Sequence, residues 1–280
     1  MNIVRQFGRV IQLNIGNAQQ SLVYNNLKIT FDVTKTISSE PNDANITIYN
    51  LNQNSRNLIT SKVYDLVELF VSYRDDDLRM IFKGEIKTVE NEYSGLDIIT
   101  KLKCSDGGQA YTEKVLIKTV AAGQKDSDAL NDSAKSFGIL KSDVDLPNDK
   151  VLPRGRVFFS DVRDVMDKIG LNNDADWSIQ DNQLVVVPKN KAIRNDEGYV
   201  ISSNTGMIGS PQKTDQGLEV ITLCNPRFKI GSLIRVESKF NEYNGDYKIQ
   251  SINHSGDLTG NDWKSKLVCT GGAYEVIGEK

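Results

Sequence analysis

The sequence predicts an α+β protein that is mainly β, in which two related β-barrel domains flank a small inserted α+β domain. Alternation of apolar and polar residues, the pattern of strands with one buried face, dominates both ends of the chain. Helical spacing of apolar residues is concentrated in the middle. The segments KLKCSDGGQAY, from Lys101, and KLVCTGGAYEV, from Lys266, echo one another at the close of the two β-rich ends. This echo favours an internal repeat.

The first predicted domain covers residues 1–105 and reads almost entirely as strands. Polar turns separate its alternating runs, as expected of a barrel or sandwich. One short helix fits residues 53–60, with Asn52 or Asn54 as the N-cap, because an asparagine side chain accepts a hydrogen bond from the free backbone N–H groups there. We expect strands at residues 9–15, 27–33, 46–48, 66–73, 80–89 and 96–102.

The second predicted domain, residues 106–199, is the inserted α+β unit. A helix at 126–137 places Ala129, Leu130, Ala134 and Phe137 on one face, and Gly138 suits its C-terminal cap. Two strands are expected to flank the dipeptide Asp181-Asn182, which is typical of a two-residue hairpin turn.

A second helix is expected in this domain at residues 160–169, with Ser160 as the N-cap and Gly170 ending it. Its apolar residues recur at spacings of three and four, so they should form a buried stripe that holds the domain together. The stripe comprises Val162, Val165, Met166 and Ile169.

The third predicted domain covers residues 200–280. Residues 200–211 are rich in Ser, Gly, Asn and Thr and are expected to form a loop or linker. Strand periodicity then returns, and Asn244-Gly245 supplies a turn. The expected strands are residues 218–223, 233–238, 246–255 and 263–270.

Composition excludes several classes of protein. The 280 residues include 34 Lys and Arg against 37 Asp and Glu, a net charge of −3, which argues against a protein that grips nucleic acid through its phosphates. Neither a signal-peptide core nor an apolar run of about 20 residues is present, so we expect no membrane insertion and synthesis as a soluble chain inside the cell. The three cysteines should be buried thiols, since they are widely spaced and lack any CxxC pattern. They are Cys104, Cys224 and Cys269.

No catalytic, cofactor-binding or metal-binding residues are predicted. His254 is the single histidine, and Ser251, Ser255 and Asp257 near it should point in different directions, so we expect a structural turn residue rather than a catalytic base. The Gly107-Gly108 and Gly271-Gly272 pairs fit strand-end turns and no phosphate-binding motif.

The remaining candidates for chemistry also favour structural roles. Trp177 and Trp263 suit core or rim packing better than sugar binding. The acidic clusters lack the pattern of a calcium loop, and we expect the first of them to be a solvated hairpin tip. A hydrolase is therefore disfavoured, although a pair of distant carboxylates is harder to exclude. The clusters are residues 75–77, Asp143 with Asp145, and Asp174 with Asp176.

Two runs of the sequence resemble the baseplate hub proteins of contractile-tailed bacteriophages. The first combines LKITFDV from Leu27, an EPN turn from Glu40, and ITIYNL from Ile46, which leads into a short helix. The second, GDYKIQSINHSGDLTGNDW from Gly245, is similar to the closing barrel of the same proteins. The resemblance covers the two ends of the chain. The middle domain matches only in its position between them.

This resemblance implies a non-enzymatic structural protein with two tube-type barrels and no cofactor. Three chains would form a pseudo-sixfold ring that joins the tail tube to the central spike. Genomic DNA would pass through its lumen without specific binding. We would then expect assembly in the host cytoplasm and a place in the virion. Three alternatives remain: a distal tail or tube-initiator protein of a non-contractile phage, a hub from a related injection machine, or a cell-wall-binding module whose middle domain is the binder.

Overall fold

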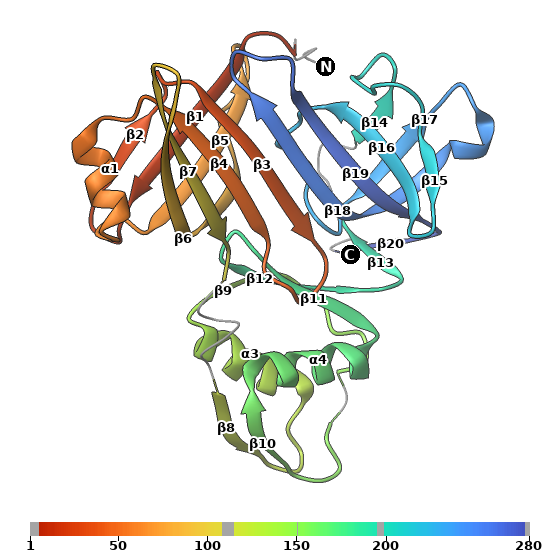
Figure 1. The fold of residues 1–280 in the computed structure, drawn as a ribbon. Helices are drawn as coiled ribbons and strands as arrows, with labels where there is room; N and C mark the ends of the chain where they lie inside the picture. The colour runs from red at the N-terminus through yellow and green to blue at the C-terminus, as the bar shows by residue number, and fades with distance from the viewer. Residues whose placement is uncertain (1–5, 108–114, 150, 195–198, 278–280) are drawn as a thin grey trace.

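The computed structural model describes residues 6–107, 115–149, 151–194 and 199–277. One sheet of thirteen strands forms two curved lobes that lie side by side, and a third unit packs beneath them (Figure 1). The three units follow one another along the chain, except that the last strand returns to the middle one. The predicted fold class, α+β and mainly β with an inserted α+β unit, is confirmed.

The first lobe, called here the N-terminal β unit, forms because alternating residues give each strand one apolar face. In β3, Ile29, Phe31 and Val33 are at most 4% exposed, whereas Asp32 points outward. The short helix begins at the predicted cap, where the Asn52 side chain accepts from the Ser55 N–H at 2.9 Å. The elements are β1 (Arg9–Gly16), β2 (Ser21–Tyr24), β3 (Ile29–Thr36), β4 (Asp43–Tyr49), α1 (Gln53–Thr60), β5 (Leu66–Tyr73), β6 (Arg79–Ser94) and β7 (Asp97–Ser105).

The second lobe, the C-terminal β unit, contains the four strands expected from its alternation. Residues 200–211 were predicted to form a loop or linker, and this is wrong in part. Strand β14 pairs in parallel with β17 and buries Ile201. Its hydrogen-bond partners lie more than 30 residues away, so local composition could not indicate them. The elements are β14 (Tyr199–Ser202), β15 (Gln212–Thr214), β16 (Gly217–Leu223), β17 (Leu233–Glu237), η1 (Asn241–Tyr243), β18 (Gly245–Asp257) and β19 (Trp263–Gly271).

The two β units share one strand order. The path β3-β4-β7-β6-β5 in the first corresponds to β15-β16-β19-β18-β17 in the second, and all neighbours are antiparallel. In each unit an isoleucine faces the cysteine of the echoed segment: Ile86 opposite Cys104, and Ile249 opposite Cys269. The register shifts by one residue directly after each isoleucine. A bulge at the same place bends both hairpins alike. The two β units therefore repeat the same strand arrangement as well as the echoed sequence.

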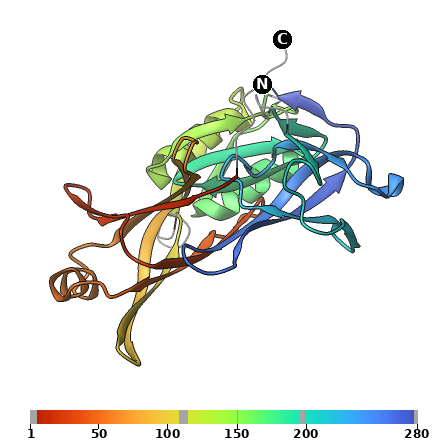
Figure 2. The same cartoon turned by 90° about the horizontal axis from the view of Figure 1, so that it is seen from above.

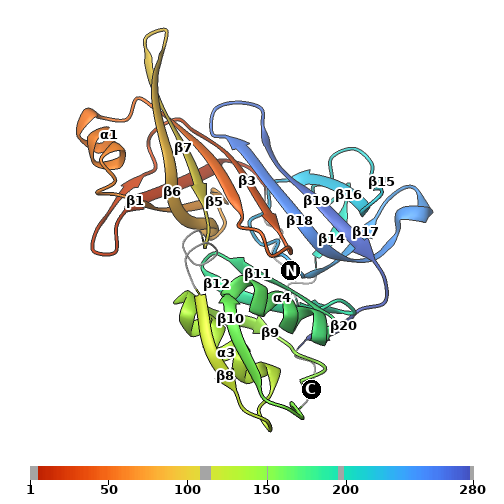
Figure 3. The same ribbon diagram turned by 60° about the horizontal axis from the view of Figure 1, so that its bottom comes forward.

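In the described part of the middle unit, helices α3 and α4 lie between two small sheets (Figures 1 and 3). Gly138 caps α3 in the left-handed conformation, with φ of 72°. Asp181 and Asn182 both have positive φ, 52° and 67°, so β11 and β12 form the predicted tight hairpin. The elements are β8 (Val115–Val120), α3 (Asp126–Phe137), β9 (Leu140–Val144), β10 (Arg156–Asp161), α4 (Val162–Asn173), β11 (Ala175–Gln180) and β12 (Gln183–Pro188); β13 (Lys191–Ile193) pairs with β20 (Glu275–Ile277).

Helix α4 buries the predicted stripe, but its ends differ from the prediction. Val162, Val165, Met166 and Ile169 are at most 1% exposed. Ser160 lies in β10 and Asp161 takes the N-cap position, because pairing of β10 with β8 holds this segment extended. Gly170 does not end the helix, which continues to Asn173. The Asp174 N–H then bonds back to the carbonyls of the last turn.

Candidate assembly surfaces

A strand pairing joins the two β units within the chain. The second half of β18 lies antiparallel to β3 over seven residue pairs, from Ser251 opposite Thr36 to Asp257 opposite Thr30. Side chains reinforce this junction on the exposed face. The Asn253 Nδ2 donates to Asp32 Oδ1 and to Thr34 Oγ1, each at 3.0 Å. The large sheet therefore runs without a break from one unit into the other.

The tip of the β18–β19 hairpin packs into the core of the N-terminal β unit. Trp263, 3% exposed, meets Phe31 edge-on at 5.6 Å and Tyr73 at 6.4 Å between ring centroids. The Arg9 guanidinium lies over the Trp263 ring and donates to the carbonyls of Asp257 and Gly260 at 2.8 and 2.6 Å. Trp263 thus serves packing, as the sequence indicated. Its location at the boundary between the units could not be predicted.

His254 was expected to be a structural turn residue, but it is buried inside β18. Its Nδ1 shares a hydrogen bond of 2.8 Å with Ser265 Oγ and lies 4.0 Å from Cys224 Sγ. Burial lowers the pKa of His254 to about 3, so the imidazole is neutral near pH 7. Ser265 is fully buried and accepts the Asn225 N–H, so this pair fits a structural hydrogen bond. The serine partner on β19 carried no signal in the sequence.

The cysteines and Trp177 also occupy core positions. Cys104, Cys224 and Cys269 are at most 3% exposed free thiols, as predicted. Burial raises the pKa of Cys104 and of Cys224 to about 12, which disfavours the reactive thiolate. Trp177 is 4% exposed and donates its Nε1–H to Asp167 Oδ1 at 2.8 Å, within the middle unit.

Buried polar contacts attach the β11–β12 hairpin to the N-terminal β unit. Asn42 donates its backbone N–H and its Nδ2 to the Asp106 carboxylate, both at 2.8 Å, and its Nδ2 also reaches the Ile179 carbonyl at 2.9 Å. Lys35 forms an ion pair of 2.5 Å with Asp181 at the hairpin turn. Burial raises the pKa of Asp106 to about 7 despite these donors. The EPN turn thus positions the middle unit.

The acidic clusters do not converge on one site. The hairpin tip that contains Asp76 was expected to be solvated. Asp76 instead pairs with Arg227 of the C-terminal β unit at 2.5 Å and is only 10% exposed. Asp145 pairs with Lys191 at 2.8 Å. Among the described residues, no group of three His, Cys, Asp or Glu side chains is placed to hold a metal ion.

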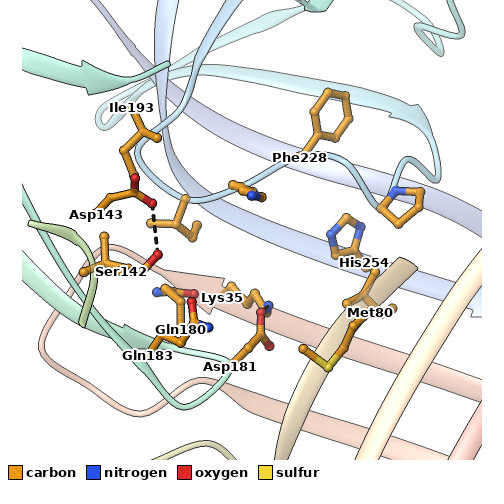
Figure 4. A pocket seen from close by; sticks show the side chains of 15 residues that line it. Lys35, Met80, Ser142, Asp143, Gln180, Asp181, Gln183, Ile193, Phe228 and His254 are labelled. Carbon is orange, nitrogen blue, oxygen red and sulfur yellow. Dashed lines mark hydrogen bonds and ion pairs between the residues drawn. The ribbon is translucent and has the colours of Figure 1, made fainter. Parts of the chain in front are cut away.

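A cavity of about 240 Å³ lies where the three units meet (Figure 4). His254 and Phe228 line it from the C-terminal β unit, Lys35 and Met80 from the N-terminal one, and Asp181 from the middle one. Of the charged side chains that line it, Lys35 and Asp181 form an ion pair with each other, and Asp143 accepts a hydrogen bond from the Ser142 hydroxyl at 3.2 Å. The cavity is therefore best explained as a gap at a three-way joint.

Several strand edges are open within the described chain, those of β6 and β15 among them. Residues 88–94 of β6 pair only with β7, and this hairpin extends away from the body of the molecule (Figures 2 and 3). Its end carries Tyr93 at 83% and Leu96 at 102% exposure. In the C-terminal β unit, β15 pairs only with β16, and its residues are exposed. Open edges invite pairing with another chain, so these edges are candidate assembly surfaces.

No helix in the described ranges combines the length and apolar character that a membrane crossing requires. Among curated proteins, none matches the sequence significantly. Solved structures do match. The 43 kDa tail protein of prophage MuSo2 from Shewanella oneidensis has a TM-score of 0.66 at 10% identity, covering 94% of this chain and 98% of that one. A tail protein of Neisseria meningitidis MC58 gives 0.64 at 10% identity, covering 94% and 96%.

A third solved structure is a component of the type VI secretion system. The Escherichia coli c3393 protein, described as structurally similar to the T4 bacteriophage tail proteins gp27 and gp5, matches with a TM-score of 0.63 at 11% identity. It covers 94% of this chain and 78% of that one. At such low identities these likenesses show the fold. The sequence itself matches the family model of baseplate hub gp41 over residues 10–262, most of its length, and this chain belongs to that family of phage tail structural proteins.

Proposed function

We propose that three copies of this chain form a pseudo-sixfold ring in the baseplate hub of a contractile tail. The main support for this proposal is that the two β units share one strand order and have a bulge at the same place. Three chains with two such units present six similar surfaces around one axis. A ring of this kind matches a sixfold tail tube on one face and a threefold spike on the other.

The partners follow from the same symmetry. The tail tube protein binds one face of the ring, and the central spike binds the other. The structural similarity of the c3393 protein to two T4 tail proteins, gp27 and gp5, supports a hub-and-spike arrangement. Genomic DNA passes through the lumen without specific binding, since the net charge of −3 offers no excess of cations to hold phosphates. Assembly takes place in the host cytoplasm, and the ring remains in the virion.

The chain acts as a scaffold without catalysis, metal or cofactor. The buried histidine, cysteines and carboxylates described above all have structural partners or burial that suits packing. The domain limits 1–105, 106–199 and 200–280 are part of this proposal. Limited proteolysis, which cuts preferentially in exposed connections, tests them at the two internal boundaries.

Mass measurement of the purified protein tests the ring. Light scattering and native mass spectrometry should give three times the chain mass of 31.2 kDa, and negative-stain images should show a ring with six lobes. A hexamer would instead support a distal tail or tube-initiator protein. A monomer at every soluble concentration would contradict the ring and favour a binding module.

A further inference from the structure

The junction between the two β units is the pairing of β18 with β3, and the corresponding edge of β6 has no partner strand within the described chain. In the C-terminal β unit, the first half of β18 pairs with β17 and residues 251–257 pair with β3. In the N-terminal β unit, the first half of β6 pairs with β5, and the corresponding residues 88–94 have no strand on that edge within the described chain. The repeat therefore leaves one junction unfilled.

The strand that should fill this position is also identified by the repeat. β3 begins the shared strand order in the N-terminal β unit, and β15 begins it in the C-terminal one. The register of pairing is also the same in the two units. Val33 lies opposite Ala44, which lies opposite Cys104. In the same way, Lys213 lies opposite Leu218, which lies opposite Cys269, so Lys213 corresponds to Val33. The outer edge of β15 is open in the described chain.

We infer that residues 88–94 of β6 in one copy pair antiparallel with β15 of the next copy around the ring. This inference rests on the proposed ring and specifies its interface. In the chain, His254 lies opposite Val33 and Asn253 opposite Thr34. Counting both strands from the shared bulge places Asn91 opposite Lys213 and Glu90 opposite Thr214 of the neighbouring copy.

The side chains at this register are complementary. Within the chain, the Asn253 amide donates to the Asp32 carboxylate and reaches the Thr34 hydroxyl. The corresponding residues are Glu90, Gln212 and Thr214. Here the carboxylate stands in the place of the amide and the amide in the place of the carboxylate. Glu90 accepts from Gln212 and Thr214, so donor and acceptor are exchanged while the hydrogen bonds are kept.

Apolar exposure leads to the same surface. The β18–β19 tip is buried against the N-terminal β unit through Trp263, with Leu258 packed beside the same core. The corresponding β6–β7 tip exposes Tyr93 and Leu96. In the next copy it would meet Ile208, which is 44% exposed and continues the β15 edge along β16 through its N–H bond to the Ile221 carbonyl. Tyrosine and leucine clustered at an exposed tip are typical of a binding surface.

The pairing also closes the ring. Each junction joins the hairpin of one unit to the first strand of the next unit, so the interface is head-to-tail. Junctions within chains alternate with junctions between chains. All six then use one geometry, as sixfold pseudo-symmetry requires. Strand addition at an open edge supplies affinity through backbone hydrogen bonds and register through side chains.

Cysteine cross-linking of the full chain tests the register. Asn91→Cys with Lys213→Cys, and Glu90→Cys with Thr214→Cys, place thiols on directly opposed residues, roughly 5 Å apart at Cβ. A short thiol-specific cross-linker should give covalent dimers and trimers and nothing larger. The native thiols are buried and leave little background. The matched control, Asn91→Cys with Thr214→Cys, puts the two thiols on opposite faces of the sheet and should not cross-link.

A charge reversal gives a second measurement. Glu90 is 60% exposed and its ion pair with Lys103 spans 3.9 Å, so Glu90→Lys should lower the melting temperature of the monomer only slightly and raise the dissociation constant of the ring at least tenfold. Asp164→Lys, at an exposed carboxylate on α4, should leave the ring intact. A trimer that forms without cross-linking at the matched pairs would overturn this interface and leave the proposed ring standing. The absence of any trimer would overturn both.

Discussion

Gly256 lies directly opposite Phe31 where β18 pairs with β3, and a Cβ added at Gly256 would come within 2.6 Å of the Phe31 ring. The same Cβ would lie 2.8 Å from the Trp263 ring. Gly256→Ala should therefore lower the free energy of unfolding by about 1–3 kcal/mol, the usual cost of overpacking. Urea denaturation of the purified variant measures this loss.

Removing the obstructing ring provides the control for this prediction. Phe31→Leu alone costs stability through lost packing, but it makes room for the new methyl group. In a double-mutant cycle, Gly256→Ala should cost clearly less in the Phe31→Leu background than in the native one. Equal costs in the two backgrounds would show that contact with Phe31 is not what requires glycine.

His254 should make stability depend on pH in the mildly acidic range. The folded pKa of about 3 lies below the ordinary 6.5, so the unfolded chain binds a proton that the folded chain does not. The contribution of His254 to stability is complete above pH 6.5 and is lost as the pH drops toward 3, by about 1.4 kcal/mol per pH unit within this window. His254→Gln should remove this dependence while leaving that of the carboxylates.

The chain has a single histidine, so its titration is directly visible by NMR. The imidazole resonances of the folded protein should not shift between pH 8 and pH 5, because the folded pKa is about 3. A midpoint near 6.5 would mean that the ring is accessible to water and that burial does not control it.

Met166 should hold the middle unit together. It is fully buried on α4, so Met166→Ala should cost about 2–5 kcal/mol of unfolding free energy. Leu171→Ala on the same helix is the control, because Leu171 is 80% exposed and its removal should change stability by less than about 0.5 kcal/mol. Ring assembly should decrease only as far as folded protein is lost. Unchanged stability with lost partner binding would instead identify the stripe as an interface.

The proposed ring should not hold DNA. With a net charge of −3 per chain, binding of duplex DNA at about 0.15 M salt should be undetectable by fluorescence anisotropy. Variants with substitutions in the two β units that alter the ring without adding positive charge should likewise show no detectable DNA binding. Tight binding that weakens steeply with salt would contradict passage through an inert lumen.

The chain should also lack hydrolase activity and need no metal. Purified peptidoglycan should remain intact on incubation with the protein, and a chelator should leave the melting temperature unchanged. Hydrolysis that is abolished by changing one carboxylate, such as Asp143 at the central cavity, would show that the cavity is an active site.

Local sequence determined most of the elements. Alternation fixed the strands, because a sheet with one wet face must place apolar residues at every second position. The Asn52 cap, the Gly138 cap and the Asp181-Asn182 turn formed where predicted, since each satisfies a backbone requirement with its own side chain or conformation. The echo around Cys104 and Cys269 indicated a repeat, and the shared strand order bears it out. The likeness to baseplate hub proteins is confirmed by the family match.

Only the tertiary structure decided how the units meet. The pairing of β3 with β18, the Asp76–Arg227 ion pair and the Ser265 partner of His254 join residues far apart in sequence, whose pattern specifies a buried face but no neighbour. For the same reason β14 was missed in a polar segment, and competition from the β10 pairing moved the start of α4 away from Ser160. Periodicity reports which side of a strand is apolar; which strand lies at its edge depends on packing of the whole chain.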